Sequence, residues 1–352
     1  MDKLLTIVIP SYNMEKYLGR CLSSLLVDDD DMGLFEALVI NDGSKDRTSE
    51  IAHDFEKKYP GTFRTIDKEN GHYGSCVNRG IAEAKGTFIK ILDADDAFDT
   101  AVFQDYLSFL SQDTVSKTAD LILSDYAEVD EQQHVFHVNH YSSASGPITL
   151  QEVMGKDKEI WFIHGFTYRT ENLRKIHYRQ TEKIAYTDHE WTFFPLVAVH
   201  AIYTFNHPLY LYTNGREGQS VSSRNHAKSL WMEAQVSSSL VSYEHRIRQS
   251  AEPGILSFMK DILLADTEHL YQLYLVTYRN MVSSLEALQK LDAFIQTVNP
   301  ELYENLEHYT TLVAGLRVRP VYEWRHKKKI KMVFHRLLYS TVDSLNQLRR
   351  RR

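Results

Sequence analysis

Three short apolar runs near the start of the chain each end abruptly in a polar motif, and this pattern constrains the fold most. Segments with apolar residues at helical spacing lie between the runs. Runs of strand, turn, helix and strand predict an α/β fold with a mostly parallel central sheet flanked by helices. The runs are residues 4–9, 35–40 and 88–92, and the motifs that follow them are Pro10-Ser11-Tyr12-Asn13, Asn41-Asp42-Gly43-Ser44 and Asp93-Ala94-Asp95-Asp96.

In open α/β sheets, ligands bind outside the carboxyl ends of the strands, so we expect the three motifs to meet at one crevice. The acidic motif places three carboxylates within four residues. Close carboxylates repel one another, and a hard divalent cation such as Mg²⁺ removes that cost while also binding substrate phosphates. The alternative for this motif is a solvated helix start with Asp96 or Asp99 as the N-cap. The alternative for Asn41-Asp42-Gly43-Ser44 is a plain turn.

The length of 352 residues suggests about two domains. We predict an α/β domain over residues 1–224, divided into halves at residues 1–100 and 101–224. A helical C-terminal region is predicted over residues 225–352. The chain has two cysteines, which implies no disulfide framework and favours a reducing cytoplasm. The N-terminal apolar run is too short for a signal peptide, and no stretch reaches the roughly 20 apolar residues that span a bilayer.

The C-terminal segment carries an unusual positive charge. Residues 317–352 contain 12 basic residues against Glu323 and Asp343, whereas the whole chain has a net charge of −7. From about Trp324 onward an apolar stripe at helical spacing accompanies these charges. The combination predicts a helix that lies on an anionic membrane surface, and nucleic acid is not an expected partner because the acidic body would repel it. The stripe could instead pack on the helical region or on a second subunit.

The chain resembles the family 2 glycosyltransferases, which have an A-type nucleotide-diphospho-sugar transferase fold. The resemblance covers roughly residues 4–100 and thins beyond them. It is carried by four motifs in the family's order and spacing: residues 6–13, residues 39–48, Glu69-Asn70-Gly71 with Asn78-Arg79-Gly80, and Asp93-Ala94-Asp95-Asp96.

The resemblance implies roles for individual residues. Asp95 is the expected metal contact for Mn²⁺ or Mg²⁺, and Asp93 would handle metal and ribose. Pro10, Tyr12 and Asp42 would line the nucleobase pocket, usually for uracil. The residues implied in nucleotide-sugar binding are Pro10, Tyr12, Asn13, Asp42, Asn70, Gly71, Asp93 and Arg216.

Inverting transfer needs a base for the acceptor hydroxyl, and in this family it is an Asp at the start of a helix. Asp188 in Thr187-Asp188-His189-Glu190 is the best match, although Thr187 replaces the family's usual Glu. Asp188 could instead be a helix N-cap, and Glu190 is the alternate carboxylate. Arg216 would contact the diphosphate from a mobile loop, or lie in an ordinary surface loop. His72 and His164 are more typical of structural histidines.

These features predict a metal-dependent, inverting glycosyltransferase that moves a sugar from a nucleotide-diphospho-sugar, most often a UDP-sugar. The acceptor would be a glycan or lipid-linked molecule in bacterial surface polysaccharide synthesis. The enzyme is expected in the cytoplasm, with peripheral attachment at the inner membrane face through its tail. The alternatives are a sugar nucleotidyltransferase and a non-catalytic subunit that binds nucleotide or glycan. The nucleotidyltransferase is disfavoured because that class usually has a loop rich in glycine and basic residues after the first strand. This chain has Ser11-Tyr12-Asn13-Met14-Glu15 there.

Overall fold

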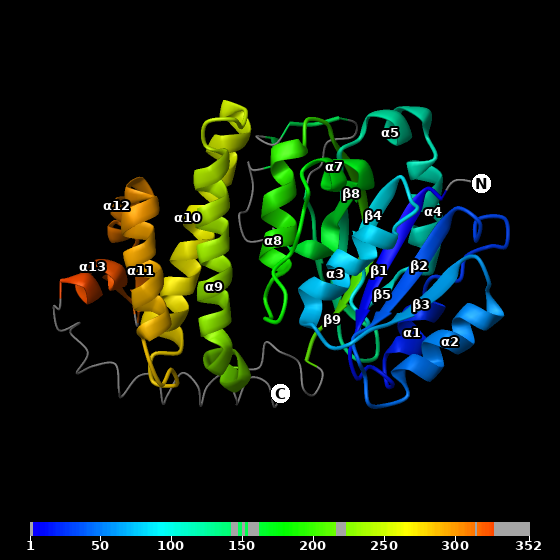
Figure 1. Cartoon of the computed structure of the whole chain (residues 1–352), viewed down its shortest axis with the longest axis horizontal. Coiled ribbons are helices and arrows are strands. Elements are labelled where there is room, and N and C mark those ends of the chain that lie inside the picture. Colours follow the sequence, from blue (N-terminus) through cyan, green and yellow to red (C-terminus); the bar gives the residue numbers. More distant parts are fainter. Residues whose placement is uncertain are drawn as a thin grey trace. The chain divides into compact units, whose positions relative to one another are not determined.

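The computed structural model describes residues 3–141, 147–149, 152–153, 162–215, 223–313 and 315–326. The chain divides into two compact units. The first comprises Met1–Gln219 and Ile247–Met259, and the second comprises Ser220–Arg246 and Lys260–Arg352. The sheet lies in the first unit, and helices dominate the second (Figure 1).

Four parallel strands form one half of the sheet, and three of them are the apolar runs of the sequence. Their order is β3-β2-β1-β4, so β1 lies between β2 and β4. The β1 side chains Leu5, Ile7, Val8 and Ile9 are fully buried, as expected for an apolar strand covered on both faces. The bounds are β1 (Leu5–Ser11), β2 (Phe35–Asn41), β3 (Phe63–Asp67) and β4 (Phe88–Ile91).

The other half of the sheet contains both parallel and antiparallel strand pairs. Strand β8 (Phe166–Arg169) runs antiparallel between β4 and β6 (Leu121–Val129), and β6 pairs parallel with β9 (Ile202–Thr213). Two antiparallel strands complete it: β5 (Ala97–Phe98) on β9 and β7 (Val135–Asn139) on β6. The fold class is therefore the predicted one, with a mixed, mostly parallel sheet.

Residues 202–212 are predicted from the sequence as a strand pair near Pro208, and this prediction is wrong. They form the single strand β9, whose register against β6 shifts on either side of Asp125. Pro208 pairs with Asp125 at this irregularity. A bulge accommodates the missing N–H of proline without reversing the chain.

Helices of the first unit connect these strands. Asp99 is the N-cap of α4 (Thr100–Leu110), as one of the alternatives above allowed, and its side chain accepts from the amides of Ala101 and Val102 at 3.1 Å each. The remaining helices are α1 (Leu18–Ser23), α2 (Thr48–Lys58), α3 (His72–Glu83), α5 (Asp113–Thr118), α7 (Thr170–Lys175) and α8 (Asp188–Phe193), with 3₁₀ turns η2 (Ile163–Gly165) and η3 (Phe194–Ala198).

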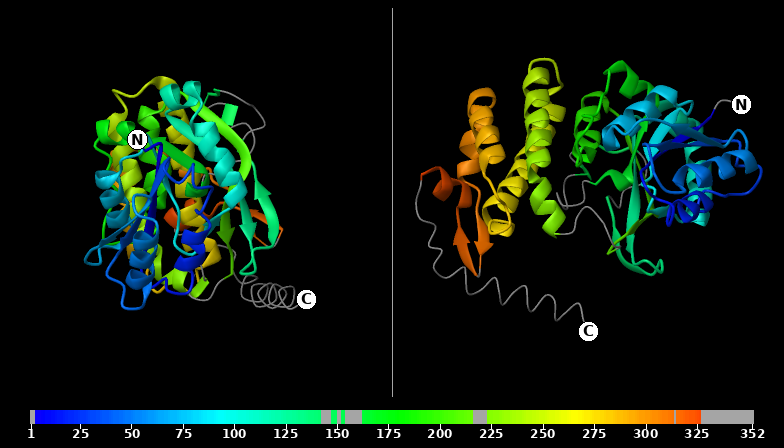
Figure 2. Two further views of the ribbon diagram at one scale, coloured as in Figure 1. Left: turned by 90° about the vertical axis from the view of Figure 1, so that its right-hand side faces the viewer. Right: turned by 60° about the horizontal axis from the view of Figure 1, so that its bottom comes forward.

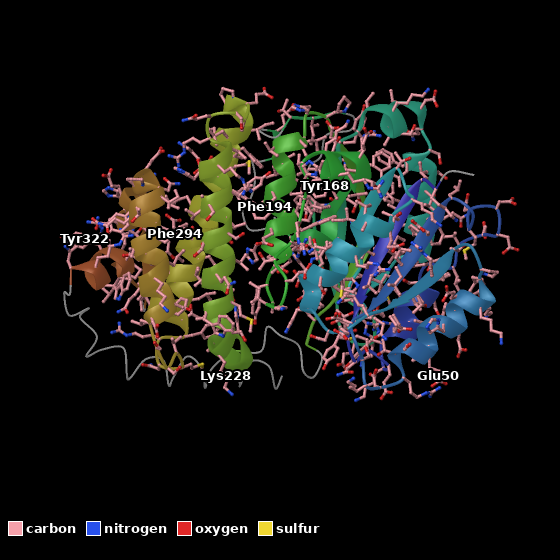
Figure 3. The ribbon with its side chains drawn as sticks, in the orientation of Figure 1. Glu50, Tyr168, Phe194, Lys228, Phe294 and Tyr322 are labelled. Atoms are coloured by element: carbon pink, nitrogen blue, oxygen red, sulfur yellow. The ribbon has the colours of Figure 1, made fainter. Side chains whose placement is uncertain are left out.

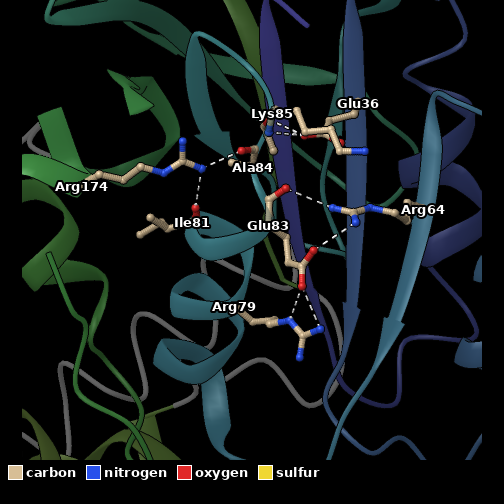
Figure 4. A network of polar contacts seen from close by, with 9 residues as sticks. Glu36, Arg64, Arg79, Ile81, Glu83, Ala84, Lys85 and Arg174 are labelled. Carbon is tan, nitrogen blue, oxygen red and sulfur yellow. Dashed lines mark hydrogen bonds and ion pairs between the residues drawn. The ribbon is translucent and has the colours of Figure 1, made fainter. Parts of the chain in front are cut away.

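A polar network fixes the C-terminal end of α3 (Figure 4). Glu83 forms ion pairs with Arg64 of β3 at 3.0 Å and with Arg79 at 2.9 Å. Arg174 of α7 donates to the carbonyl oxygens of Ile81 and Ala84 at 3.1 and 2.6 Å. These contacts tie the C-terminal end of α3 to β3 and α7.

The described residues of the second unit are helical apart from one hairpin, which the sequence pattern does not predict. The hairpin (Figure 2) turns at Gly315, whose φ of 79° suits glycine. The elements of the C-terminal region are α9 (Ser223–Ile247), α10 (Pro253–Gln272), the π-turn η4 (Leu273–Thr277), α11 (Glu286–Val298), α12 (Pro300–Glu307), β10 (Thr311–Val313), β11 (Leu316–Val318) and α13 (Pro320–Arg325). The end of α9 at Ile247 and the part of α10 up to Met259 belong to the first unit. No helix among the described residues is long and apolar enough to cross a membrane.

A cavity of about 630 Å³ lies within the second unit. Its lining includes Lys228 and Trp231 of α9 and Phe294 of α11, two of which are labelled in Figure 3. All of its lining residues belong to the second unit.

Candidate functional site

The parallel pairing brings the polar motifs to one edge of the sheet. Ser11, Asn41 and Asp67 lie side by side in register on β1, β2 and β3. The amide of Asp42 donates to the Ser11 carbonyl at 2.8 Å, and the amide of Leu92 donates to the Val8 carbonyl at 2.9 Å. The residues after β1, β2 and β4 therefore leave the sheet together, as the sequence pattern predicts.

The loop after β1 is tied to the loop after β2. Asn13 donates from its amide to Ser44 Oγ at 3.0 Å and accepts from the Lys45 amide at 2.8 Å. Its φ of 55° is unusual for a residue with a side chain and is compatible with an Asn in a tight turn. Tyr12 remains 47% exposed, which leaves its ring face accessible for stacking. Pro10 lies within β1, opposite Ile40.

Asp42 is buried and binds a third segment, residues 68–71, at this edge of the sheet. Its Oδ1 accepts from Lys68 Nζ at 2.6 Å and from the Gly71 amide at 2.9 Å, and its carbonyl accepts from Asn70 Nδ2 at 2.9 Å. The structure thus brings together Asp42, Asn70 and Gly71, which the sequence analysis had singled out. Lys68 was not anticipated, because nothing in the sequence marks a lysine as the ion-pair partner of Asp42.

The three carboxylates after β4 have different surroundings. Asp96 is buried, and its two oxygens accept from Tyr210 Oη at 2.6 Å and from the Thr213 amide at 2.8 Å. Asp93 and Asp95 are partly exposed. Burial, followed by the negative charges of Asp95 and Asp93, raises the pKa of Asp96 well above its usual range. Such a concentration of negative charge favours a cation.

Asp93 is held from two sides. Its Oδ1 accepts from Tyr73 Oη at 3.0 Å, and its amide donates to Tyr210 Oη at 3.2 Å. The Tyr210 hydroxyl therefore joins Asp93 to Asp96, to which it donates its own proton. The backbone of Asp95 is held by Arg20, whose Nη2 donates to the Asp95 carbonyl oxygen.

Asp93 and Asp96 form a group with His164 in which one possible ligand atom of each lies within 4.8 Å of the others. Asp95 is not part of this group. His164 is 8% exposed, and its Nδ1 has no hydrogen-bond partner in the described part of the chain. Burial and the neighbouring Lys90 lower the pKa of His164 to about 3, so the imidazole is neutral. Two carboxylates and a neutral imidazole fit a divalent metal.

Lys90 of β4 lies beneath this group and is fully buried. Its Nζ donates to the His164 carbonyl at 2.7 Å, and burial lowers its pKa to about 7. Lys90 has no signal in the sequence, because it stands inside an apolar run. His164 resembles a structural histidine in the sequence, because no local motif connects it to carboxylates some 70 positions earlier.

Asp188 is the first residue of α8, and Thr187 occupies the N-cap position without a side-chain capping bond. The N-cap alternative for Asp188 is therefore wrong. Glu190 is fully buried, and its oxygens accept from the Thr181 amide at 2.6 Å and from Thr181 Oγ1 at 2.7 Å. Glu190 thus fastens the loop that leads into α8, whereas Asp188 is only partly buried.

Tyr73 connects the two halves of the site. Its hydroxyl binds Asp93, and its pKa is raised by burial first and then by the charges of Asp93 and Asp188. Asp188 therefore lies close enough to influence the same phenol. Backbone strain accompanies this region, because His72, Lys183 and Tyr186 have φ values of 64°, 68° and 63°. Strained residues of this kind cluster at functional sites.

Two predicted features cannot be placed. Arg216 lies outside the described residues, and so does the basic segment 327–352. His72 is exposed at the start of α3.

Comparison with known proteins extends these observations. The family described as "Glycosyl transferase family 2" matches residues 6–179. "Uncharacterized glycosyltransferase EpsJ" of Bacillus subtilis (strain 168) is 28% identical over 194 residues, which cover 53% of this chain and 54% of EpsJ. "Minor teichoic acid biosynthesis protein GgaB" of the same organism is 29% identical over 107 residues, 30% of this chain and 12% of GgaB. The matched part thus spans about half of EpsJ and far less of GgaB.

A solved structure shares the fold. The crystal structure of S. aureus TarS 1–349 in complex with UDP-GlcNAc superimposes with a TM-score of 0.52 at 18% identity. The superposition covers 89% of this chain and 95% of the TarS chain. At this identity the likeness supports the fold alone.

Proposed function

Residues 6–179 make this chain a member of the family 2 glycosyltransferases, and on that premise we propose that it transfers a sugar from a UDP-sugar to a hydroxyl of a glycan or lipid-linked acceptor, with inversion at the anomeric carbon. The observation that carries the proposal is that the Tyr73 hydroxyl donates to Asp93, on the donor side, while the charge of Asp188, at the start of α8, helps to raise the pKa of the same phenol. A transferase that works by direct displacement needs a donor-side acid cluster and a base close to each other.

The donor would bind at the strand ends. The exposed ring of Tyr12 is suited to stacking on a base, and Asp42 is suited to accept the N3–H of uracil. Asp42 Oδ1 already accepts two hydrogen bonds, yet a carboxylate offers about four lone-pair positions, so capacity remains. Pro10, Asn13, Asn70 and Gly71 would shape this pocket, and Arg216 would contact the diphosphate.

A divalent cation, Mn²⁺ or Mg²⁺, would neutralise the diphosphate and stabilise the leaving nucleoside diphosphate. Asp95 is the proposed metal contact, and Asp93 is proposed to contact metal and ribose. Tyr73 donates to the Asp93 carboxylate at 3.0 Å, which limits the rotation of this side chain before substrate arrives, and Tyr210 accepts from the Asp93 backbone amide at 3.2 Å.

Asp188 is proposed to take the proton of the acceptor hydroxyl. The acceptor oxygen then forms the new bond to the anomeric carbon. The bond between that carbon and the diphosphate oxygen breaks at the same time, and the nucleoside diphosphate leaves with the electron pair. Glu190 is an unsuitable base because it is buried and engaged by Thr181.

The acceptor class is proposed from the relatives. GgaB is described as a teichoic acid biosynthesis protein, and the TarS structure holds UDP-GlcNAc. A bacterial surface polymer or its lipid-linked precursor is therefore the acceptor that we propose for this chain.

Calorimetry tests the donor site. We expect UDP to bind wild-type protein in Mn²⁺ and to bind much more weakly in chelator, and a panel of nucleotide sugars to show slow metal-dependent hydrolysis for UDP-sugars. Asp95→Ala should abolish most of the metal effect. Asp113→Ala is the matched control, because Asp113 is an exposed carboxylate of α5 that pairs with Lys117. Equal UDP affinity with and without metal would refute the cation's role.

A further inference from the structure

We propose that His164 supplies a nitrogen ligand to the divalent cation, together with Asp93 and Asp96, so that this site selects metals that accept imidazole. The inference rests on the proposed function for the cation's role, and it adds a ligand without replacing Asp95. It extends the site beyond the acidic motif, since His164 lies on η2, in the segment between β7 and β8.

The spacing of the three side chains suits one cation. One possible ligand atom from each lies within 4.8 Å of the other two. Ligand atoms on opposite sides of a single cation are separated by about 4.2 Å, given metal–ligand distances of about 2.1 Å. Small rotations of the carboxylates would therefore bring all three atoms into one coordination sphere.

His164 Nδ1 is buried and has no hydrogen-bond partner in the described part of the chain, which is costly for a polar atom. Its ring packs against the rings of Tyr210 and Tyr212, with centroids 4.6 and 4.5 Å away. The aromatic contacts explain why an imidazole fits here, but they leave its polar edge unsatisfied. A cation bound at Nδ1 would satisfy it.

The backbone of η2 is held in position for this role. Lys90 Nζ donates to the His164 carbonyl at 2.7 Å, and Ser124 Oγ donates to the Gly165 carbonyl at 3.3 Å. A Cβ on Gly165 would lie 2.2 Å from the Tyr141 ring, so only glycine allows this close approach. A buried metal ligand normally has its orientation fixed by such neighbours.

The two carboxylates are also held in position. The Tyr210 hydroxyl donates to Asp96 Oδ2 and accepts from the backbone amide of Asp93, and the Tyr73 hydroxyl donates to Asp93 Oδ1. Both Asp96 oxygens accept one hydrogen bond each, from Tyr210 and from the Thr213 amide. Each retains a further lone pair for a metal.

The nitrogen ligand determines which metal binds best. Mg²⁺ prefers oxygen ligands and keeps several waters, whereas imidazole suits later transition metals and is accepted by Mn²⁺ and Co²⁺. We therefore expect the chain to bind Mn²⁺ and Co²⁺ more tightly than Mg²⁺. The preference should depend on His164.

Electron spin-echo spectroscopy of Mn²⁺ bound to the untagged full-length protein gives a direct readout without turnover. We expect modulation from an imidazole ¹⁴N in wild-type protein, and its loss in His164→Gln. The affinity for Mn²⁺ should fall at least about tenfold in that variant, the scale seen when a metal site loses a supporting group, while the affinity for Mg²⁺ changes little. His134→Gln is the control, because His134 is an exposed histidine whose ring contacts Asp130.

The wild-type spectrum decides the inference even if His164→Gln fails to fold. No nitrogen coupling at saturating Mn²⁺ would overturn it, as would coupling that persists in a folded His164→Gln protein. Different results would refute the proposed function. Nitrogen coupling without UDP binding or UDP-sugar hydrolysis would support His164 as a metal ligand and refute the transferase. Metal-dependent UDP binding without nitrogen coupling would support the transferase and refute His164 as a ligand.

Discussion

Asp188 and Glu190 lie two residues apart, yet their surroundings suit different tasks. Glu190 is fully buried and binds the Thr181 amide and hydroxyl, at 2.6 and 2.7 Å. Asp188 is partly buried, and its charge influences Tyr73. A base must reach the acceptor hydroxyl, so accessibility favours Asp188. A carboxylate that holds a loop contributes through structure, and its loss should appear in stability.

We expect Asp188→Asn to fold and bind UDP normally but to transfer sugar at least about a hundredfold more slowly, the usual scale for loss of a general base. Glu190→Gln should instead lower the unfolding temperature, because the amide cannot accept from Thr181 at both positions. Steady-state transfer and thermal unfolding of both variants separate the roles. Near wild-type turnover in Asp188→Asn, with an inactive but stable Glu190→Gln, would show that the wrong carboxylate was chosen.

The residues that sequence could place share one property: they follow apolar strands. Asp42 and Asp93 could be predicted at one edge because the carboxyl ends of parallel strands meet there. Lys90 and His164 could not. Lys90 is hidden in a strand of apolar neighbours, and His164 reaches Asp93 only because β8 pairs with β4 across the sheet. Such a pairing depends on the tertiary fold and leaves no local pattern.

At the scale of elements, α3 and the loop before α8 hold the two halves of the site together. Asn78 of α3 donates to the Gln180 carbonyl at 2.8 Å and accepts from the Gln180 amide at 2.8 Å. Gln180 is buried and donates to the Thr187 carbonyl at 2.7 Å, directly before Asp188. Gly74 permits this approach, since a Cβ there would lie 2.0 Å from the Thr181 carbonyl oxygen.

Gly74→Ala should therefore move the loop that carries Asp188. We expect it to lower the free energy of unfolding by about 1–3 kcal/mol, the usual cost of overpacking, and to lower turnover while UDP affinity changes less. Gly19→Ala is the matched control in α1, because no atom lies within 4 Å of its added Cβ. That control should be neutral or slightly stabilising. Urea unfolding and transfer assays measure both effects, and an unaffected Gly74→Ala would mean that the loop adapts freely.

Element types in the first hundred residues could be predicted because strand and helix periods alternate there. The prediction weakened where pairing is irregular. Strand β9 continues through Pro208 because a register shift absorbs the proline, and the β10–β11 hairpin is too short for a periodic signal. The course of β9 depends on its pairing with β6, which is distant in sequence, and the hairpin depends on a single turn residue, Gly315.

At the scale of the whole molecule, the structure revises where the basic tail begins. The interfacial helix was expected from about Trp324, but α13 ends at Arg325 and packs within the second unit. Arg325 binds Asp292 at 2.7 Å with only 5% of its side chain exposed, and the Trp324 ring lies 6.0 Å from that of Tyr271. Removing one partner of a buried ion pair is strongly destabilising. Any deletion that tests the tail must therefore spare both residues.

Residues 327–352 are the segment that we propose binds the membrane. Their sequence has nine basic residues against Asp343, and its apolar stripe includes Val333, Leu337 and Leu345. Basic residues near an anionic surface contribute on the order of 1 kcal/mol each. We expect full-length protein to float with phosphatidylglycerol vesicles, to be released by high salt, and to ignore phosphatidylcholine vesicles. A chain that ends at His326 should stay folded, keep UDP binding and fail to float. If that chain unfolds or aggregates while the intact protein ignores both vesicles, the stripe packs on protein and the membrane proposal fails.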